Sequence, residues 1–250
     1  MKSSSGSFLL LLALLFCTPA SRAGLPADFL HLPRIILWAW QVPENMEFID
    51  PRQVAVAYLD QTVMVRDSVA TEPRFQPLRL PPATQVIAVV RVEMPSRSGL
   101  PSDTNREALV QALLQSARHP GVAALQVDFD VTRSQRPFYR ATLQELRRRM
   151  PPGMPLSITA LASWCAHDRW IAGLPVSEAV PMLFRMGRDG AYFTRRGPAE
   201  SLREPLCSGS LGVSLDEPWP AHVQGKRLYV FEKHSWTPEA VAHTLERASQ

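Results

Sequence analysis

Two aspartates stand two positions apart near the end of the segment ALQVDFDV, residues 124–131. Apolar and polar residues alternate through this segment, which is typical of a β-strand, so Asp128 and Asp130 share the face opposite the apolar side chains. Hydrolysis of a glycosidic bond uses such paired carboxylates, because one acid protonates the leaving oxygen while a second acts as nucleophile or base. The segment therefore predicts an acidic site at a strand end, and its role depends on the elements that surround it.

Eight short runs of strand character recur along the chain, and they span residues 34–40, 54–59, 86–93, 122–130, 155–161, 178–185, 209–215 and 227–233. Amphipathic helices are predicted at residues 102–119, 135–150 and 237–248, where apolar residues recur at helical spacing. Ser102 or Asp103 can cap the first helix, and Thr237 can cap the last. Strands that alternate with helices imply parallel pairing through right-handed crossovers, so eight such units indicate an α/β fold, a (β/α)8 TIM-like barrel.

The predicted barrel is irregular in two places. Residues 60–82, after the second strand, alternate as an extended β-hairpin, and Pro73 and Pro77 forbid a long helix there. Residues 216–226, after the seventh strand, also lack a helical pattern, so few helices are expected in that part. An open doubly wound sheet is the alternative fold, but no glycine-rich phosphate-binding loop follows any of the predicted strands.

Strand parity predicts which side chains face the barrel interior. Bulky apolar residues face the helices of such a barrel, so Leu125, Val127 and Phe129 point outward while Asp128 and Asp130 point inward. The same parity turns further polar residues inward near the C-terminal ends of their strands: Arg91, Glu93, Ser157, Thr159, Ser163, Ser214 and Asp216, with Arg185 at the end of the sixth strand. Barrel active sites lie at this end, and we therefore expect a polar mouth there.

Candidate catalytic residues are the acids of this mouth: Asp128, Asp130, Asp216 and Glu217, with Glu232 on the eighth strand as a further acid. Asp130 is expected to face Asp216 or Glu217 across the mouth. Candidate ligand-binding residues combine charged groups with tryptophans that can stack on sugar rings: Trp38, Trp40, Arg91, Glu93, Trp164, Arg185 and Trp219, with Trp236 after the eighth strand. The alternative is structural, with Asp128 paired to Arg91 or Arg185 and the first two tryptophans in the barrel core.

The first 23 residues have the pattern of a secretory signal, with Lys2 before an apolar run at residues 8–17 and small residues around Ala23. We expect cleavage after Ala23, a single barrel domain at residues 24–250, and a periplasmic or secreted protein without a stable membrane span. Cleavage lowers Lys plus Arg from 27 to 25 against 23 acids, so the net charge falls from +4 to +2. That small charge and the lack of a basic stripe argue against a nucleic-acid partner.

The spacing of cysteines and histidines does not fit the common metal sites, and no metal or other cofactor is expected. Cys165 and Cys207 remain after cleavage, and in an oxidising compartment they can form a disulfide. Cys165 follows the fifth strand whereas Cys207 precedes the seventh, so the two nominally lie at opposite ends of the barrel. A disulfide therefore requires a connecting segment to fold back.

Five motifs in order resemble an exported bacterial family called domain of unknown function 3142: WAWQ (38–41), LQVDFD (125–130), LSITALASWC (156–165), VPMLFRMG (180–187) and VSLDEPW (213–219). The resemblance implies a TIM-barrel-like, glycosidase-like architecture and supplies no reaction. More remotely, VDFD is similar to the strand-four signature of chitinase-type family 18 glycoside hydrolases, whose alternating acids end on a glutamate acid catalyst. Asp128 and Asp130 match the alternating acids, but the glutamate position falls on Thr132. A proton donor would then be Asp130 or come from another strand.

Two hypotheses about function remain open. In the first, the chain is a glycoside hydrolase-like enzyme acting on a cell-envelope or exported polysaccharide, with Asp130 and Asp216 or Glu217 as the acid pair. In the second, it is a non-catalytic barrel that binds a glycan or an envelope protein, and its acids are structural or contact the ligand. The separation of the carboxylates and the openness of the mouth distinguish the two.

Overall fold

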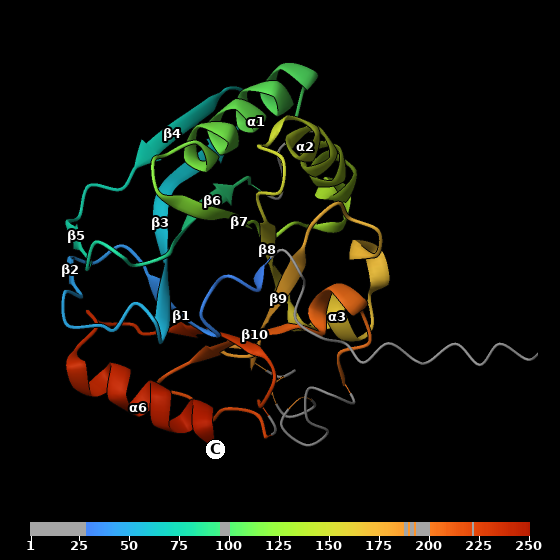
Figure 1. Ribbon diagram of the computed structural model, residues 1–250. Coiled ribbons are helices and arrows are strands. Elements are labelled where there is room, and N and C mark those ends of the chain that lie inside the picture. The colour runs from blue at the N-terminus through green and yellow to red at the C-terminus, as the bar shows by residue number, and fades with distance from the viewer. Residues whose placement is uncertain (1–28, 96–100, 188–189, 191–192, 194–200, 222) are drawn as a thin grey trace, which may run out of the picture.

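The structure is a computed structural model that describes residues 29–95, 101–187, 190, 193, 201–221 and 223–250 (Figure 1). The predicted signal segment, residues 1–23, lies outside the described residues. In the described part, the strands of the barrel are β1 (Ile35–Ala39), β3 (Val54–Val65), β6 (Val86–Glu93), β7 (Val122–Asp128), β8 (Leu156–Leu161), β9 (Glu178–Met182), β10 (Ser210–Ser214) and β11 (Arg227–Phe231). They pair in parallel, and β1 pairs with both β3 and β11, which closes the sheet. The predicted barrel is confirmed, and the open sheet is excluded because the ring has no free edge.

Two apolar layers surround the strands. Inside the ring, large residues of some strands pack against small residues of others: Ile36, Trp38, Ala55, Ala57, Ile87, Val89, Ala124, Val180 and Tyr229. Gly212 on β10 leaves room for an indole ring, since a Cβ there would lie 3.0 Å from Cη2 of Trp38. Outside the ring, Leu125 and Val127 of β7, and Phe129 directly after it, pack in one cluster with leucines of the helices. The predicted parity of the fourth strand is therefore confirmed.

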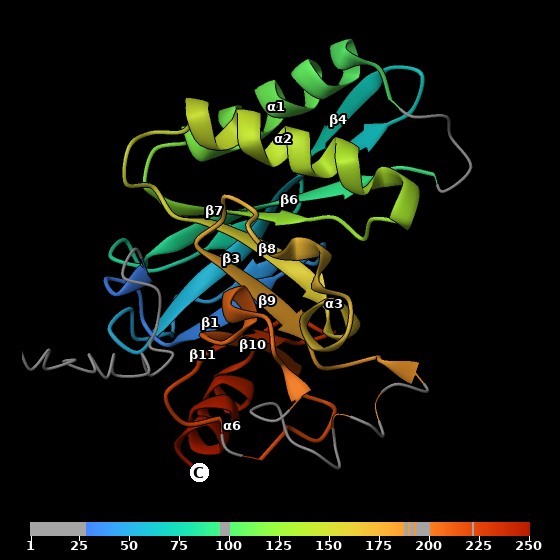
Figure 2. The same ribbon diagram turned by 90° about the vertical axis from the view of Figure 1, so that its right-hand side faces the viewer.

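Three helices longer than two turns cover the outer face in the described part of the chain: α1 (Asp103–Ala117), α2 (Arg136–Arg149) and α6 (Pro238–Ser249). The side chain of Ser102 accepts a hydrogen bond from the N–H of Asn105, and Thr237 accepts one from Ala240, as expected for N-caps. α1 and α2 lie side by side over β6 and β7, while α6 covers the far side of the barrel (Figure 2). Among the described residues, no helix has the length and apolar character that a membrane crossing requires.

The second connection extends the sheet. β3 does not end at Leu59 as predicted but continues to Val65 through an irregularity in its pairing with β6, between Leu59 and Gln61. It then turns back into β4 (Val69–Pro73), which pairs with it antiparallel. Two short strands, β2 (Glu44–Asn45) and β5 (Leu78–Arg79), pair with each other in parallel and form a separate small sheet. Between β10 and β11, the described residues form no helix.

A disulfide joins Cys165 to Cys207, with 5.9 Å between their Cα atoms. Cys165 lies in the short helix α3 (Ala162–Ala166) after β8, and Cys207 ends the 3₁₀ helix η5 (Pro205–Cys207) before β10. The segment before η5 folds back onto α3, because the N–H groups of Arg203 and Glu204 donate to the carbonyl oxygen of Cys165 at 2.9 and 3.1 Å. Because this segment folds back, the two cysteines can form a disulfide although their nearest strands place them at opposite ends of the barrel.

Candidate functional site

A cavity of about 220 Å³ opens at the C-terminal end of the barrel strands, and its lining comes from six of them and the turns that follow: Trp38, Trp40, Arg91, Asp128, Asp130, Thr159, Met182, Phe184, Arg185 and Phe231. A second cavity adjoins it on the side of β3 and β6, where Arg66 and Glu93 add to the lining. A third adjoins it beside α3, where Ser163 adds to the lining. Asp130 lines all three cavities, which we call together the mouth groove.

Asp128 is nearly buried, with 7% of its surface exposed, and both of its carboxylate oxygens have partners. The hydroxyl of Thr159 donates to Oδ1 at 2.7 Å, and Nη1 of Arg91 lies 3.3 Å from Oδ2. Burial raises the pKa of Asp128, while the hydrogen bond from Thr159 and the charge of Arg91 act against that rise. The predicted ion pair with Arg91 therefore forms, and the guanidinium of Arg91 also bonds Glu93 at 2.9 Å.

Asp130 differs from Asp128 in being exposed at the rim of the groove. No hydrogen bond or ion pair from the residues that the structure describes engages its carboxylate. Partial burial by the groove walls nevertheless raises the pKa of Asp130, and the nearby positive charge of Arg91 limits the rise. Asp130 is thus an acid that a bound ligand can reach and that holds its proton to a higher pH than an ordinary aspartate.

An aromatic wall faces these acids. The rings of Phe184 and Phe231 stack at 5.7 Å between centroids, and Trp38 lies 6.2 Å from Phe184. The guanidinium carbon of Arg185 lies 4.9 Å from the centroid of the Phe231 ring. Neither phenylalanine was predicted from the sequence, although Phe231 ends β11 and Phe184 comes two residues after the end of β9. Their position at or just after the C-terminal end of a strand, where the polar candidates also lie, could have identified them.

The two tryptophans of the first strand have different roles. Trp38 is buried in the barrel, and its Nε1 donates to Oε1 of Gln126 at 2.8 Å. It therefore contributes only a small part of its surface to the cavity lining. Trp40 is half-buried in the cavity wall. The guanidinium of Arg74 donates to the carbonyl oxygen of Trp40, which ties this loop to the segment after β4. Trp236 is buried against the same region and donates to the carbonyl oxygen of Trp38 at 2.9 Å.

Asp216 and Glu217 do not line the mouth groove, because local groups use their carboxylates. Asp216 accepts a hydrogen bond from Ser214 and lies 3.7 Å from the amine of Lys233, and the bond from Ser214 is the main cause that lowers its pKa. The carboxylate of Glu217 accepts the N–H of Arg185 at 3.1 and 3.2 Å. We expected Asp130 to face Asp216 or Glu217 across the groove. The structure does not bring these acids together there.

Other predicted residues also lie elsewhere. Trp164 is buried outside the barrel wall, edge-on to Trp170 at 5.0 Å, and Trp219 packs under the guanidinium of Arg247 on α6 at 4.3 Å. Glu232 accepts the backbone N–H of His234. Thr132, at the position of the chitinase glutamate, starts the short 3₁₀ helix η2 (Arg133–Gln135) and does not line the groove.

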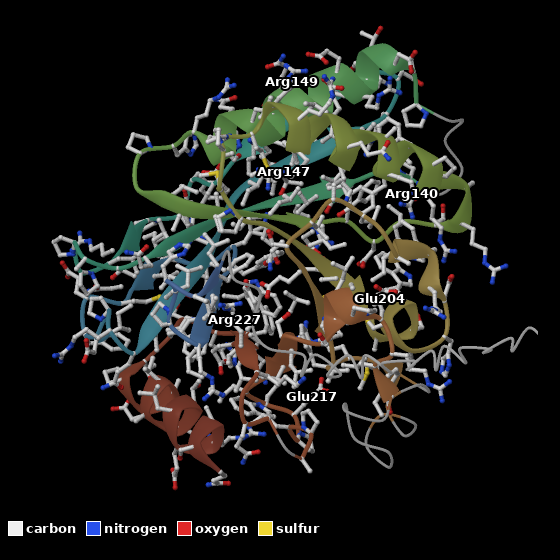
Figure 3. The ribbon with its side chains drawn as sticks, turned by 45° about the vertical axis from the view of Figure 1, so that its right-hand side comes forward. Arg140, Arg147, Arg149, Glu204, Glu217 and Arg227 are labelled. Carbon is white, nitrogen blue, oxygen red and sulfur yellow. A yellow bond between two sulfur atoms is a disulfide. The ribbon has the colours of Figure 1, made fainter. Side chains whose placement is uncertain are left out.

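A second acid–arginine pair closes the opposite end of the barrel. Glu178 and Arg227 are both fully buried and lie 3.1 Å apart, and Arg227 stands within the ring of strands (Figure 3). The hydroxyl of Tyr229 donates to Glu178 at 2.6 Å, and Nη2 of Arg227 donates to the carbonyl oxygen of Phe29 at 2.6 Å. We call Glu178, Arg227 and Tyr229 the barrel floor.

Comparison with solved structures finds two chains that this barrel is similar to. The Bacillus cereus spore cortex-lytic enzyme SleL matches 73% of this chain with 19% identity and a TM-score of 0.50. The chitinase domain of the spore coat protein CotE from Clostridium difficile matches 90% of the chain with 12% identity and a TM-score of 0.39. The chain spans 51% and 64% of those two chains. None of the curated proteins matches it significantly.

One family model matches the sequence, and it covers residues 83–178, from the approach to β6 to the start of β9. That stretch contains β7 with Asp128, as well as Asp130 and Thr159. The resemblance drawn from the sequence motifs is confirmed: over residues 83–178 this chain matches the family described as domain of unknown function, DUF3142.

Proposed function

We propose that this protein is exported and cleaves a glycosidic bond of a cell-envelope or exported polysaccharide, with Asp130 as the proton donor. One observation carries the proposal. Asp130 follows β7, lines all three cavities of the mouth groove, has no hydrogen-bond or ion-pair partner among the described residues, and has a raised pKa. An acid with these properties matches what a glycosidase needs to protonate a leaving oxygen.

The neighbouring residues have supporting roles in the proposed reaction. Asp130 gives its proton to the leaving oxygen, and water then adds a hydroxyl to the anomeric carbon and returns a proton to the enzyme. Asp128, held by Thr159 and Arg91, keeps Arg91 beside Asp130. Trp40 offers an apolar surface in the groove for a sugar ring. SleL, which this barrel is similar to, is named a spore cortex-lytic enzyme, and that name is in line with this class of activity.

A non-catalytic glycan-binding barrel is the second candidate function. It is favoured by the engagement of the other acids, since Asp128 pairs with Arg91, Asp216 with Lys233, and Glu217 with the backbone of Arg185. A retaining or inverting mechanism with two free carboxylates would need a second acid in the groove. Glu93 is half-exposed there, but it bonds Arg91.

The test is an assay of reducing-end release from peptidoglycan, chitin oligomers and bacterial exopolysaccharides, between about pH 4 and 8. The protein is purified after expression of the full chain, together with Asp130→Asn and the control Asp216→Asn, which changes an exposed acid outside the groove. We expect release by the wild type, a loss of about 100-fold or more in Asp130→Asn, and little change in the control. If wild type and Asp130→Asn fold alike and neither releases sugar, hydrolysis of these glycans is excluded and the binding function takes its place.

Export is part of the proposal and has its own test. The pattern of residues 1–23 is its support. Expression of the full chain in a bacterial host should give a periplasmic or secreted protein whose N-terminal residue is Gly24. A cytoplasmic protein that retains Met1 would contradict it.

A further inference from the structure

Arg185 has an unusual backbone. It is the only residue other than glycine with a positive φ among those that the structure describes, at 52°. This conformation is unfavourable for a side chain with a Cβ, and such outliers gather at functional sites, where the surroundings hold them in place. Here the holding group is Glu217, whose two carboxylate oxygens accept the N–H of Arg185 at 3.1 and 3.2 Å.

The side chain of Arg185 is presented to the mouth groove. Its guanidinium lies over the ring of Phe231, which stacks in turn on Phe184. Arg185 lines two of the three cavities, and Asp130 lines the same two. The aromatic face covers one side of the guanidinium plane, so the N–H groups at its edges remain available to a ligand.

The two arginines of the central cavity differ in their ion pairs. Arg91 pairs with Asp128 and Glu93. In the part of the chain that the structure describes, no carboxylate lies within 4.0 Å of the guanidinium of Arg185. The charge of Arg185 helps to lower the pKa of Asp216, but only from beyond ion-pair distance. The local fold thus holds a guanidinium at the groove wall without a direct carboxylate partner among the described residues.

We infer that Arg185 is a subsite for a carboxylate of the ligand, so that the mouth groove takes a polysaccharide with carboxylate-bearing sugars. This inference rests on the proposed polysaccharide function and names its substrate class. The planar fork of a guanidinium matches a planar carboxylate through two parallel hydrogen bonds. A monoanion fits better than a doubly charged phosphate, because Asp128, Asp130 and Glu93 already line the groove.

A ligand carboxylate at Arg185 also acts on the reaction. Its negative charge would stand in the groove with Asp130, and a nearby negative charge favours the protonated form of an acid. Binding of a sugar with a carboxylate would therefore keep Asp130 protonated. Recognition at Arg185 and proton transfer from Asp130 are then linked through the ligand.

The test is affinity electrophoresis in native gels that contain polysaccharides differing only in their carboxylates. The probes are polygalacturonate against its methyl-esterified form, and hyaluronan against its carboxyl-reduced form. The proteins are wild type, Arg185→Gln, Arg185→Lys, Glu217→Gln and the control Arg118→Gln. Arg118 is an exposed arginine that follows α1, before β7 begins, and it lies outside the groove lining.

We expect the wild type to bind the acidic member of at least one pair about tenfold more tightly than its neutral partner. Arg185→Gln should lose this preference, because its binding of the acidic member falls to the level of the neutral one. Arg185→Lys should keep part of the preference because the charge remains without the fork. Glu217→Gln should weaken the preference through the position of Arg185. Arg118→Gln should behave as wild type, and melting curves confirm that each variant is folded.

The outcomes separate this inference from the function on which it rests. Equal binding of both members of each pair, or a preference that survives in folded Arg185→Gln, overturns the carboxylate subsite and leaves the polysaccharide function standing. Binding of no member of either pair counts against polysaccharide recognition by the groove, and the subsite is overturned with it.

Discussion

The barrel contains two acid–arginine pairs, one at each end, and their surroundings differ. At the barrel floor, Glu178 and Arg227 are fully buried, and hydrogen bonds from Tyr229 and to the carbonyl oxygen of Phe29 add to their ion pair. In the mouth groove, the side chains of Arg91 and of its partner Asp128 are 40% and 9% exposed. The floor pair is closed to any ligand, whereas the mouth pair lies in a cavity wall.

The difference shows what separates a structural pair from a site. Every charged group of the floor has a protein partner, as a buried charge requires. At the mouth, by contrast, Asp130 and Arg185 both line the central cavity, and neither forms an ion pair with a described residue. The same chemistry therefore holds the barrel together at one end and leaves groups available at the other.

The largest effect is expected at the floor. Arg227→Met leaves Glu178 buried without its counter-ion and should lower the free energy of unfolding by about 3–5 kcal/mol in urea titrations. Burial already raises the pKa of Glu178. Without Arg227 it rises further, and a raised pKa costs stability as the pH rises through it, so the deficit should shrink in acid. Glu178→Leu in the same chain should recover most of the loss, and a single variant as stable as the wild type would refute the structural role.

The matched change at the mouth should cost much less. Arg91→Met removes a partly exposed guanidinium, while Asp128 keeps the hydrogen bond from Thr159. We expect a loss of about 1 kcal/mol or less in the same titrations, because solvent reaches the Arg91 side of this ion pair and screens it. A loss equal to that of Arg227→Met would make the mouth pair a structural element like the floor, and the contrast between the two ends would fail.

Strand parity could be predicted from the sequence because each barrel strand has one apolar face. The alternation of Leu125, Val127 and Phe129 identified the inward face of β7, and with it Asp128. The positions of the caps Ser102 and Thr237 were also predictable, since capping depends only on neighbouring residues. The alternation of side chains along a strand is a local property, so it can be predicted without knowing how the barrel closes.

The residues beyond the strand ends could not be placed in this way, because parity stops where the strand stops. Trp164 and Trp219 follow strands, as Trp40 does, yet they pack outside the barrel. The positive φ of Arg185 depends on Glu217, 32 residues further along the chain. The floor pair joins β9 to β11, which are not neighbours in the sheet, so its register depends on the closure of the whole ring.

The carboxylate of Asp130 should not stabilise the fold at neutral pH. Its raised pKa means that the folded state disfavours the charged form, so its ionisation costs stability as the pH rises through that pKa. Asp130→Asn should therefore be as stable as the wild type in acid and equal or slightly more stable near pH 8, by at most about 0.5 kcal/mol. Melting curves at both pH values check this, and a clear loss of stability would assign Asp130 to the barrel structure instead of the groove.

The smallest effect concerns the pH dependence of sugar release. If protonated Asp130 is the acid, activity falls as the pH rises through its pKa, which the charge of Arg91 holds down. Arg91→Met removes that charge, so the pKa of Asp130 should rise and the alkaline limb should move upward by about a few tenths of a pH unit. Arg118→Met, far from the groove, controls for the change in net charge. A limb that stays in place in Arg91→Met would mean that a group other than Asp130 donates the proton. The mouth would then still differ from the floor in its openness, but Asp130 would serve to hold the ligand.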